Sequence, residues 1–255
     1  MDLHLRGKTA VVTGASRGIG LAITAQLLDE GARVIGAART VTPELAALGV
    51  PAVCVDLATP DGPNRLAESA LTTLGGVDIL INNVGGAETL KPFVEVTDED
   101  WAAAFEWNFL SAVRLCRALL PNLVERHGCI VNISSESARI PGGPVDYSAA
   151  KAALTNLGKL LAEEYAGRVR VNTVSPGITR TRVWEGDGMG AQLAAAAGVD
   201  QATFLAGLPA ATGTITGRLV EPAEIATLVA WLVSDHAASV TGADYYIDGG
   251  AIKTV

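Results

Sequence analysis

The chain has few of the residues that bind metals or form disulfides. It contains three cysteines and three histidines among 255 residues. Cys54, Cys116 and Cys129 are odd in number and stand in apolar surroundings, which predicts small buried side chains in a reducing compartment rather than a disulfide framework. The histidines, at positions 4, 127 and 236, show no metal-ligand spacing. We therefore expect no metal site and no disulfide.

Long apolar runs and excess positive charge are also missing. No apolar stretch reaches the about 18 residues that a membrane helix needs, and the opening MDLHLRGK lacks the apolar region of a secretory signal. The 19 lysines and arginines face 27 acidic residues, a net charge of −8. This balance argues against nucleic acid or an anionic membrane as the main partner. We expect a cytoplasmic protein that acts on a small molecule.

The apolar pattern predicts strands that alternate with helices. With 49% hydrophobic and 18% charged residues, the chain can bury the core of one large α/β domain, residues 1–255. Expected strands cover 8–13, 33–37, 52–55, 77–81, 129–133, 168–174 and 244–247, and a long helix covers 98–126. This alternation predicts a doubly wound parallel sheet of about seven strands. The Gly- and Ala-rich segment around 182–217 interrupts it and predicts a substrate lid.

Glycines and polar residues follow the expected strands. In such a sheet, ligands bind beyond the carboxyl ends of the strands. The residues at these ends include Gly14, Arg39, Asp56, Asn82, Ser135 and Pro176. Their common position predicts a binding site along this edge of the sheet.

The first of these turns resembles a phosphate-binding turn. Thr13-Gly14 begins the spacing G-x-x-x-G-x-G, which continues with Gly18 and Gly20 and opens a helical pattern. A strand, a glycine turn and a helix in this order bring a helix N-terminus to a pyrophosphate. The alternative is a glycine-rich turn without a ligand.

The end of the second strand predicts which dinucleotide would bind. An acidic residue there would bind a ribose 2′-hydroxyl, whereas an arginine accommodates a 2′-phosphate. The chain has Ala37-Ala38-Arg39-Thr40 at this point, and Arg17 lies in the glycine turn. Two arginines and no carboxylate favour NADP(H), although both could be solvated surface residues.

Further polar residues leave two interpretations open. Asp56, which precedes Leu57, could contact the edge of an adenine ring or cap its own loop. Asn82 and Asn83 could bind loop backbone, a cofactor or both. Asn108 lies within an apolar helical pattern. A buried asparagine needs partners, so it is either satisfied in the core or holds a site water.

The stretch from position 135 to position 151 contains the candidate catalytic residues. Tyr147 and Lys151 are four residues apart, on one face of a helix. An ammonium beside a phenol favours the phenolate, so we expect Lys151 to lower the pKa of Tyr147 toward the range of general acid–base catalysis. An upstream serine would hold a substrate oxygen. Counting back from Tyr147 points to Ser134, and counting forward from the strand at 129–133 favours Ser135.

These motifs resemble the short-chain dehydrogenase/reductase family over essentially the whole chain, in its single-domain form and among 3-oxoacyl-reductase-like members. The glycine turn matches the cofactor turn of that family, and Asn82-Asn83-Val84-Gly85 resembles its N-N-A-G motif. The segment Ser175-Pro176-Gly177 with Thr181 resembles the segment beside the nicotinamide, and residues 246–250 resemble the terminal strand motif. Glu136 and Arg139 depart from the pattern, and either rim the site or pair with each other.

The resemblance implies a Rossmann fold, an activity and a set of site residues. The implied activity is NADP(H)-dependent interconversion of a ketone and a secondary alcohol on a hydrophobic molecule. The implied catalytic residues are Asn108, Ser135, Tyr147 and Lys151, and Ser135, Tyr147 and Trp184 would contact the substrate. The implied cofactor contacts are Gly14, Ser16, Arg17, Gly18, Ile19, Gly20, Arg39, Asp56, Leu57, Asn83, Val84, Gly85, Tyr147, Lys151, Pro176, Gly177, Ile178 and Thr181.

Other functions and an assembly state are part of the same interpretation. The alternatives are a catalytically inactive NADP(H)-sensing protein and an NAD-preferring alcohol dehydrogenase. An enoyl reductase is disfavoured, because the pattern it would resemble spaces Tyr and Lys more widely. The resemblance also implies a homo-oligomer, a tetramer or dimer, with 225–233 and 244–247 as interface elements or as parts of the monomer core.

Overall fold

A parallel sheet runs through the structure, a computed structural model that describes residues 2–87 and 90–253. In this part of the chain the sheet has seven strands in the order β3-β2-β1-β4-β5-β6-β7, and every neighbouring pair is parallel. The strands are β1 (Thr9–Thr13), β2 (Arg33–Ala38), β3 (Ala52–Cys54), β4 (Ile79–Asn82), β5 (Cys129–Ile133), β6 (Arg170–Pro176) and β7 (Asp244–Ile247). The doubly wound fold predicted from the sequence is confirmed, and the strand order reverses between β1 and β4.

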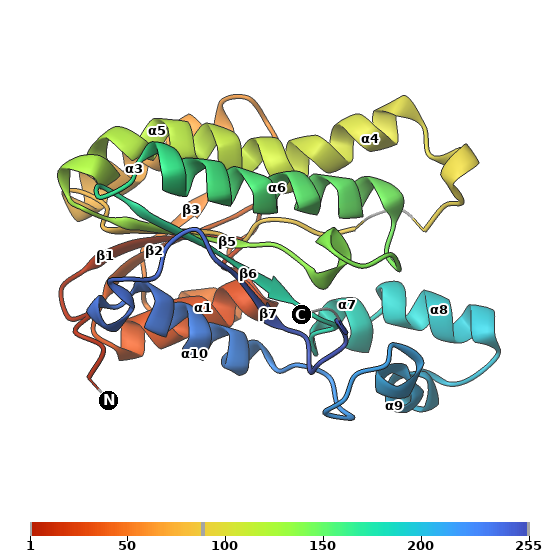
Figure 1. Cartoon of the computed structure of the whole chain (residues 1–255). Coiled ribbons are helices and arrows are strands. Elements are labelled where there is room, and N and C mark those ends of the chain that lie inside the picture. Colours follow the sequence, from red (N-terminus) through yellow and green to blue (C-terminus); the bar gives the residue numbers. More distant parts are fainter. Residues whose placement is uncertain (1, 88–89, 254–255) are drawn as a thin grey trace.

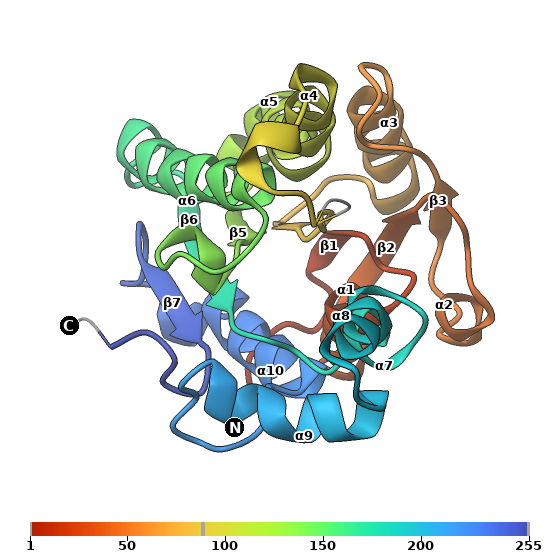
Figure 2. The same ribbon diagram turned by 90° about the vertical axis from the view of Figure 1, so that its right-hand side faces the viewer.

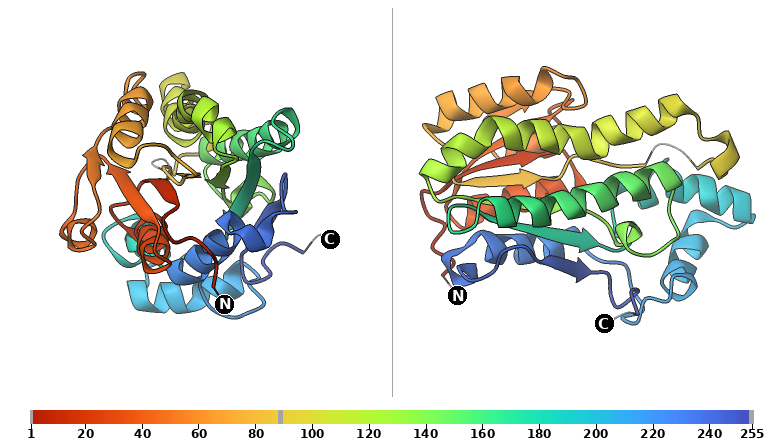
Figure 3. Two further views of the ribbon diagram at one scale, coloured as in Figure 1. Left: turned by 90° about the vertical axis from the view of Figure 1, so that its left-hand side faces the viewer. Right: turned by 45° about the horizontal axis from the view of Figure 1, so that its top comes forward.

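Helices cover both faces of this sheet (Figure 1). The helices are α1 (Gly18–Asp29), α2 (Pro43–Ala47), α3 (Gly62–Leu74), α4 (Asp98–Phe105), α5 (Ser111–Glu125), α6 (Val145–Glu164), α7 (Arg182–Glu185), α8 (Met189–Ala197), α9 (Gln201–Ala211) and α10 (Pro222–Val233). One face carries α1 and α10, and the other carries α3, α5 and α6, which lie side by side in Figure 3. Because all neighbouring strands are parallel, their carboxyl ends lie together at one edge of the sheet.

Each face of the sheet has its own apolar core. Leu27 and Ile225 belong to the cluster on the α1 and α10 side, and Leu66 and Leu119 to the cluster on the other side. These side chains are fully buried. Each such burial contributes about 1.5–3 kcal/mol, which makes these two layers the main source of stability.

Local signals in the sequence set several helix ends. Helix α4 begins with a capping box in which Thr97 and Asp100 satisfy each other's backbone amides. Helix α3 ends at Gly75, which has a positive φ of 75° as a C-cap in the left-handed region. Helix α6 begins after Pro144, which cannot extend a helix backward, and so Tyr147 lies in its first turn.

The expected long helix at 98–126 is present but is not uniform. Helices α4 and α5 are joined without a break by a π-helical turn, Glu106–Leu110, that contains Asn108. A π turn inserts one extra residue and is frequent at functional sites. It rotates Asn108 out of the regular helical repeat of its neighbours.

Two expectations about the strands need correction. Strand β6 ends at Pro176 rather than Val174, because its partner β7 pairs with it as far as Pro176. Cys54 is exposed rather than buried. It lies on β3, the edge strand of the sheet, where only one neighbour covers the backbone, and its thiol contacts the carbonyl oxygen of Arg39 at 3.1 Å.

The segment at 182–217 is helical rather than an irregular loop. We call it the helical insertion; it contains α7, α8 and α9 and lies beyond the carboxyl ends of the strands, on the side of α1 and α10 (Figures 1 and 2). Its alanines favour helix, and Asp200 caps the start of α9 by accepting a hydrogen bond from the Thr203 amide at 2.9 Å. Within the described residues, no helix is both long and apolar enough to cross a membrane.

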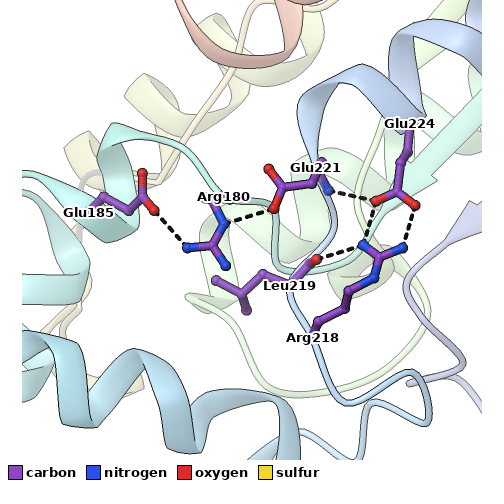
Figure 4. Close-up of polar contacts among 6 residues, drawn as sticks. All are labelled: Arg180, Glu185, Arg218, Leu219, Glu221 and Glu224. Atoms are coloured by element: carbon purple, nitrogen blue, oxygen red, sulfur yellow. Dashed lines mark hydrogen bonds and ion pairs between the residues drawn. The ribbon is translucent and has the colours of Figure 1, made fainter.

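Ion pairs fasten both ends of the helical insertion (Figure 4). Arg180 donates to Glu185 of α7 and to Glu221 before α10, at 2.8 Å in both cases. Arg218 binds both carboxylate oxygens of Glu224 at 2.7 Å. A backbone bridge between Thr179 and Val220 lies beside these pairs. The two chain segments that lead into and out of the insertion are therefore held together at its base.

We expect Arg180→Met to loosen the insertion without unfolding the protein. Exposed ion pairs contribute about 0–1 kcal/mol each, so Tm should change by only a few degrees. Local opening should become about fivefold more frequent, and a nonspecific protease should cut the exposed α8–α9 link faster by that factor. Limited proteolysis followed by mass spectrometry measures this rate.

Lys159→Met provides the matched control for that prediction. Lys159 forms an exposed ion pair with Glu163 at 3.5 Å on α6, away from the insertion. Its loss should leave the cleavage rate of the α8–α9 link unchanged. Equal acceleration in both variants would contradict the anchoring role of Arg180.

Candidate active site

The turn between β1 and α1 has no room for side chains. Gly14 and Gly18 have φ values of 65° and 55°, in the region that favours glycine. A Cβ on Gly20 would lie 2.2 Å from the carbonyl oxygen of Gly14, so any larger residue would force the helix away from the turn. Helix α1 thus begins directly at a bare backbone turn, an arrangement suited to a phosphate.

The end of β4 holds this turn in place. The Asn83 side-chain amide donates to the carbonyl oxygen of Thr13 at 2.8 Å. The backbone amides of Asn83 and Val84 both donate to the Thr13 hydroxyl, at 2.8 and 3.0 Å. Asn83 therefore has the backbone-binding role that the sequence left open, and Asn82 binds Asn132 inside the sheet at 2.9 Å.

The segment after β6 approaches the same turn. Gly177 donates its amide to Ile247 of β7 at 3.0 Å, and Ile178 accepts from the amide of Val220 at 3.0 Å. A Cβ on Gly18 would lie 3.2 Å from the methyl group of Thr181. The fold thus brings the 176–181 segment and the glycine turn side by side, although they are far apart in the sequence.

The expected adenosine-side residues have different surroundings. Arg17 and Arg39 are exposed, and the Arg39 guanidinium lies 5.3 Å from the centre of the Trp107 ring. Asp56 accepts a hydrogen bond from the amide of Ala58 at 3.0 Å, so it caps its own loop, and Leu57 beside it is buried. The carbonyl oxygen of Ser16 accepts from the Thr42 hydroxyl at 2.8 Å, and Ile19 packs against the core.

Tyr147 and Ser135 meet between α6 and β5. Tyr147 is partly buried in the first turn of α6, and Ser135 follows the last residue of β5 by two positions. The Ser135 hydroxyl lies close enough to the Tyr147 phenol to lower its pKa. Burial and the nearby Glu136 carboxylate raise that pKa, and burial is the largest effect.

The net direction of this shift differs from the one expected from the sequence. The pKa of Tyr147 is raised above its ordinary value rather than lowered, because burial disfavours the phenolate. The Lys151 ammonium is 5.8 Å from the centre of the tyrosine ring. The phenol is therefore protonated at neutral pH in this structure.

The two candidate serines occupy separate environments. The Ser134 hydroxyl donates to the carbonyl oxygen of Lys151 at 3.0 Å and lies 2.7 Å from the Thr155 hydroxyl. It therefore joins β5 to α6 inside the structure. Ser135 is the serine beside Tyr147, so the geometry favours Ser135 as the substrate-orienting residue.

Lys151 lies at the centre of the site. It is 3% exposed, and its ammonium donates to the carbonyl oxygen of Ile133 at 2.9 Å. A Cβ on Gly85 would lie 2.7 Å from this nitrogen, which explains glycine at that position. Burial lowers the pKa of Lys151 to about 8.

Asn108 is satisfied by protein groups. Its side-chain oxygen accepts from the amide of Gly86 at 2.9 Å, and its amide nitrogen donates to the carbonyl oxygens of Gly86 and Ala104, both at 3.0 Å. Of the two interpretations from the sequence, the satisfied amide describes this structure. Asn108 holds the Gly85–Gly86 backbone against Lys151.

Trp107 is a neighbour of the site that the sequence did not indicate, and Glu136 is one that the sequence placed either at the rim or in a pair with Arg139. Trp107 supports Arg39, and its ring would be 2.8 Å from a Cβ on Gly86. Its place directly before Asn108 is the signal that could have identified it. Glu136 directly follows Ser135, and a Cβ on Gly177 would lie 2.9 Å from its Oε2 atom. No ion pair joins Glu136 to Arg139 in the described part of the chain.

Trp184, the expected substrate contact, lies in α7 at the start of the helical insertion. Its carbonyl oxygen accepts from the Gln201 side chain at 2.6 Å, which ties α7 to α9. Its role toward a substrate stays a prediction. Among the described residues, no group of three or more His, Cys, Asp or Glu side chains could hold a metal ion.

The comparisons with known proteins agree with this geometry over nearly the whole chain. A family model described as "Enoyl-(Acyl carrier protein) reductase" matches residues 14–251. The chain is 36% identical over 258 residues to 3-oxoacyl-(acyl-carrier-protein) reductase FabG of Escherichia coli (strain K12), covering 97% of this chain and 98% of that protein. It is 34% identical over 264 residues to L-xylulose reductase of Bos taurus, with 100% of both chains covered.

A solved structure shows the same fold. The crystal structure of L-sorbose reductase from Gluconobacter frateurii, complexed with NADPH and L-sorbose, matches with a TM-score of 0.92 at 34% identity, and 100% of both chains are covered. Together, the fold and these relatives define an oxidoreductase that acts on CH–OH and ketone groups. The chain belongs to the short-chain dehydrogenase/reductase family.

The buried carboxyl of Glu136 should make stability depend on pH. Burial, followed by the nearby Asp248 carboxylate, raises its pKa from the ordinary 4.5 to about 7, and Tyr147 is the other titratable neighbour. The folded chain holds this proton more tightly than the unfolded chain, so stability falls as pH rises from 4.5 through about 7.

We expect Glu136→Gln to raise stability at pH 8 by about 1–2 kcal/mol and to change it little at pH 4. This range is reduced from about 1.4 kcal/mol per pKa unit because the carboxyl is partly exposed. Denaturant unfolding at the two pH values measures the difference. Glu68→Gln, on the exposed face of α3, is the control and should leave the pH dependence unchanged. A uniform effect of Glu136→Gln at both pH values would contradict the raised pKa.

Proposed function

We propose that this protein is an NADP(H)-dependent reductase that interconverts a ketone and a secondary alcohol on a small, largely apolar molecule, with Tyr147 as the acid and base. The observation that carries the proposal is the meeting of Ser135, Tyr147 and Lys151. Ser135 follows β5, Tyr147 and Lys151 come from α6, and Lys151 lies beside the Gly85 backbone. The expected cofactor-binding residues follow the carboxyl ends of β1, β2, β3, β4 and β6.

The residues present fit a bound dinucleotide. Close packing against protein atoms requires glycine at positions 14, 20 and 85, so the chain carries no side chain at these points near the ends of β1 and β4. Arg17 and Arg39 are exposed and would bind a 2′-phosphate, since β2 ends in Ala37-Ala38-Arg39 without a carboxylate. NADPH in the L-sorbose reductase complex supports this choice. When bound, the dinucleotide supplies the hydride.

Residues of the protein itself would transfer the proton. The Tyr147 phenol, protonated because its pKa is raised, would donate a proton to the substrate oxygen. Ser135 would orient that oxygen by a hydrogen bond. Reduction needs the phenol, which is the form that Tyr147 has at neutral pH.

Lys151 and Asn108 would support this step. Lys151, with a pKa of about 8, is mostly charged at pH 7 and would bind the nicotinamide ribose and return a proton toward Tyr147. One of its hydrogens is held by Ile133. Asn108 would keep Gly85 and Gly86 in position beside it, through its bonds to Gly86.

The substrate, the compartment and the assembly belong to the same proposal. Apolar residues of the helical insertion, with Trp184 and Phe204 among them, would contact a hydrophobic portion of the substrate. Relatives are named for oxoacyl, xylulose and sorbose reduction, which supports a ketone as the substrate.

The three free cysteines are consistent with a reducing cytoplasm. Strand β7 is the sheet edge and α10 packs on α1, and a homo-oligomer would use their outer surfaces.

Tyr147→Phe should abolish ketone reduction and spare NADPH binding. General acid catalysis contributes about 10²–10⁴-fold, so kcat should fall by at least that factor. Steady-state kinetics over a panel of ketones and NADPH titration by fluorescence measure the two properties. Tyr165→Phe, at the far end of α6 beside Arg168, is the matched control and should keep full activity. Undiminished turnover in Tyr147→Phe would remove the proposed mechanism.

Arg39→Ala should weaken the binding of NADPH much more than the binding of NADH. A charged hydrogen bond contributes about 1.5–3 kcal/mol, which corresponds to a 10- to 100-fold rise in KM for NADPH and almost none for NADH. Initial rates with each cofactor measure the ratio. Arg65→Ala, an exposed arginine of α3, should change neither value. Equal changes for both cofactors in Arg39→Ala would contradict the phosphate assignment.

A further inference from the structure

Glu136 places a carboxyl group in the candidate site, directly after Ser135. It follows Ser135 and begins a short turn, Glu136–Ala138, at the carboxyl end of β5. Its Oε2 atom is buried and has no hydrogen-bond partner in the described structure. This atom lies over Gly177 at the end of β6, close enough that a Cβ there would be 2.9 Å away.

The groups around Glu136 do not supply a donor. Asp248 accepts hydrogen bonds from the amides of Gly250 and Ile252, at 2.9 and 2.7 Å, so both of its oxygens are engaged as acceptors. Arg139 is exposed and forms no ion pair with Glu136 in the described residues. A buried acceptor with no donor is costly to folding. A ligand that donates a hydrogen bond would remove this cost.

We propose that Glu136 is a specificity-determining residue that accepts a hydrogen bond from a hydroxyl group of the substrate, so that the substrate is a hydroxyketone. The inference rests on the proposed function, because Ser135 and Tyr147 define where the carbonyl oxygen would lie. Glu136 is the residue after Ser135 and acts electrostatically on Tyr147. The hydroxyl therefore stands on a carbon adjacent to the carbonyl, and the apolar remainder of the molecule faces the helical insertion.

The protonation state of the Glu136 carboxyl favours a hydroxyl rather than a cationic group as the part of the substrate that it binds. Burial and Asp248 raise the pKa of Glu136 to about 7, so the carboxyl is partly protonated at neutral pH and has no need of a counter-ion. A hydroxyl both donates and accepts a hydrogen bond, and so it pairs with either protonation state.

Isosteric substrate pairs test the inference. In 1-hydroxybutan-2-one a hydroxyl replaces one methyl group of pentan-3-one, and 2-hydroxyacetophenone is related to propiophenone in the same way. We expect the unmodified enzyme to reduce each hydroxyketone with at least about tenfold higher kcat/KM, because a site built around a hydrogen bond rejects the analogue that lacks it. Initial rates of NADPH oxidation measure these values.

Two variants test whether Glu136 causes the preference for hydroxyketones. Glu136→Leu removes the acceptor at similar volume, and it should lower kcat/KM for the hydroxyketones about 10- to 100-fold while that for the apolar ketones stays equal or rises. Glu136→Gln keeps an acceptor oxygen and should retain part of the preference. Thermal unfolding at pH 8 shows whether each variant is folded, and neither should be less stable than the unmodified chain.

The outcomes separate this inference from the proposed function. Equal kcat/KM for both members of a pair, or an equal loss for both in Glu136→Leu, overturns the specificity role and leaves the reductase intact. Turnover of neither ketone in either pair removes the proposed function, and the inference with it. A preference that disappears in Glu136→Leu and survives in part in Glu136→Gln supports the inference.

Discussion

A buried ammonium group organises this site. Burying a cation is costly unless it is held by hydrogen bonds, and Lys151 is almost completely buried. From the second turn of α6, the Lys151 ammonium donates a hydrogen bond to the carbonyl oxygen of Ile133, the last residue of β5. It also packs against the backbone of Gly85, which follows β4. Three elements must be in their final places before this group has its partners. The geometry of the candidate site and the packing of α6 on the sheet therefore depend on each other.

The electrostatics around Tyr147 follow from the same burial. The phenol and the Glu136 carboxyl are both pushed toward their neutral forms, and the pKa of the Lys151 ammonium is lowered to about 8. The pKa values of Glu136 and Lys151 move toward pH 7, as is typical of functional sites, whereas the pKa of Tyr147 moves away from it. In this structure, burial is the largest cause of each of these three shifts.

Much of the fold could be predicted because the signals are local. The strands at 129–133 and 244–247 have the predicted bounds, since a short apolar run between polar turns has few alternatives. The spacing of Tyr147 and Lys151 predicted a shared helix face for the same reason. The prediction for Cys54 was wrong because an apolar context does not distinguish a central strand from an edge strand. The helices of the insertion were missed because their apolar periodicity is weak.

By itself, the sequence determined the parallel sheet, the glycine turn and the order of polar residues along the chain. These depend on periodicity and on backbone conformations that single residues allow or forbid. Only the tertiary structure decided which serine faces Tyr147, that the Asn108 side chain binds the backbone of Gly86 and Ala104, and that Oε2 of Glu136 lacks a hydrogen-bond partner among the described residues. Each of these depends on distances between residues that are separated in the sequence, 12 positions for Ser135 and Tyr147, 22 for Gly86 and Asn108 and 41 for Glu136 and Gly177. Packing sets such distances, and no local pattern encodes them.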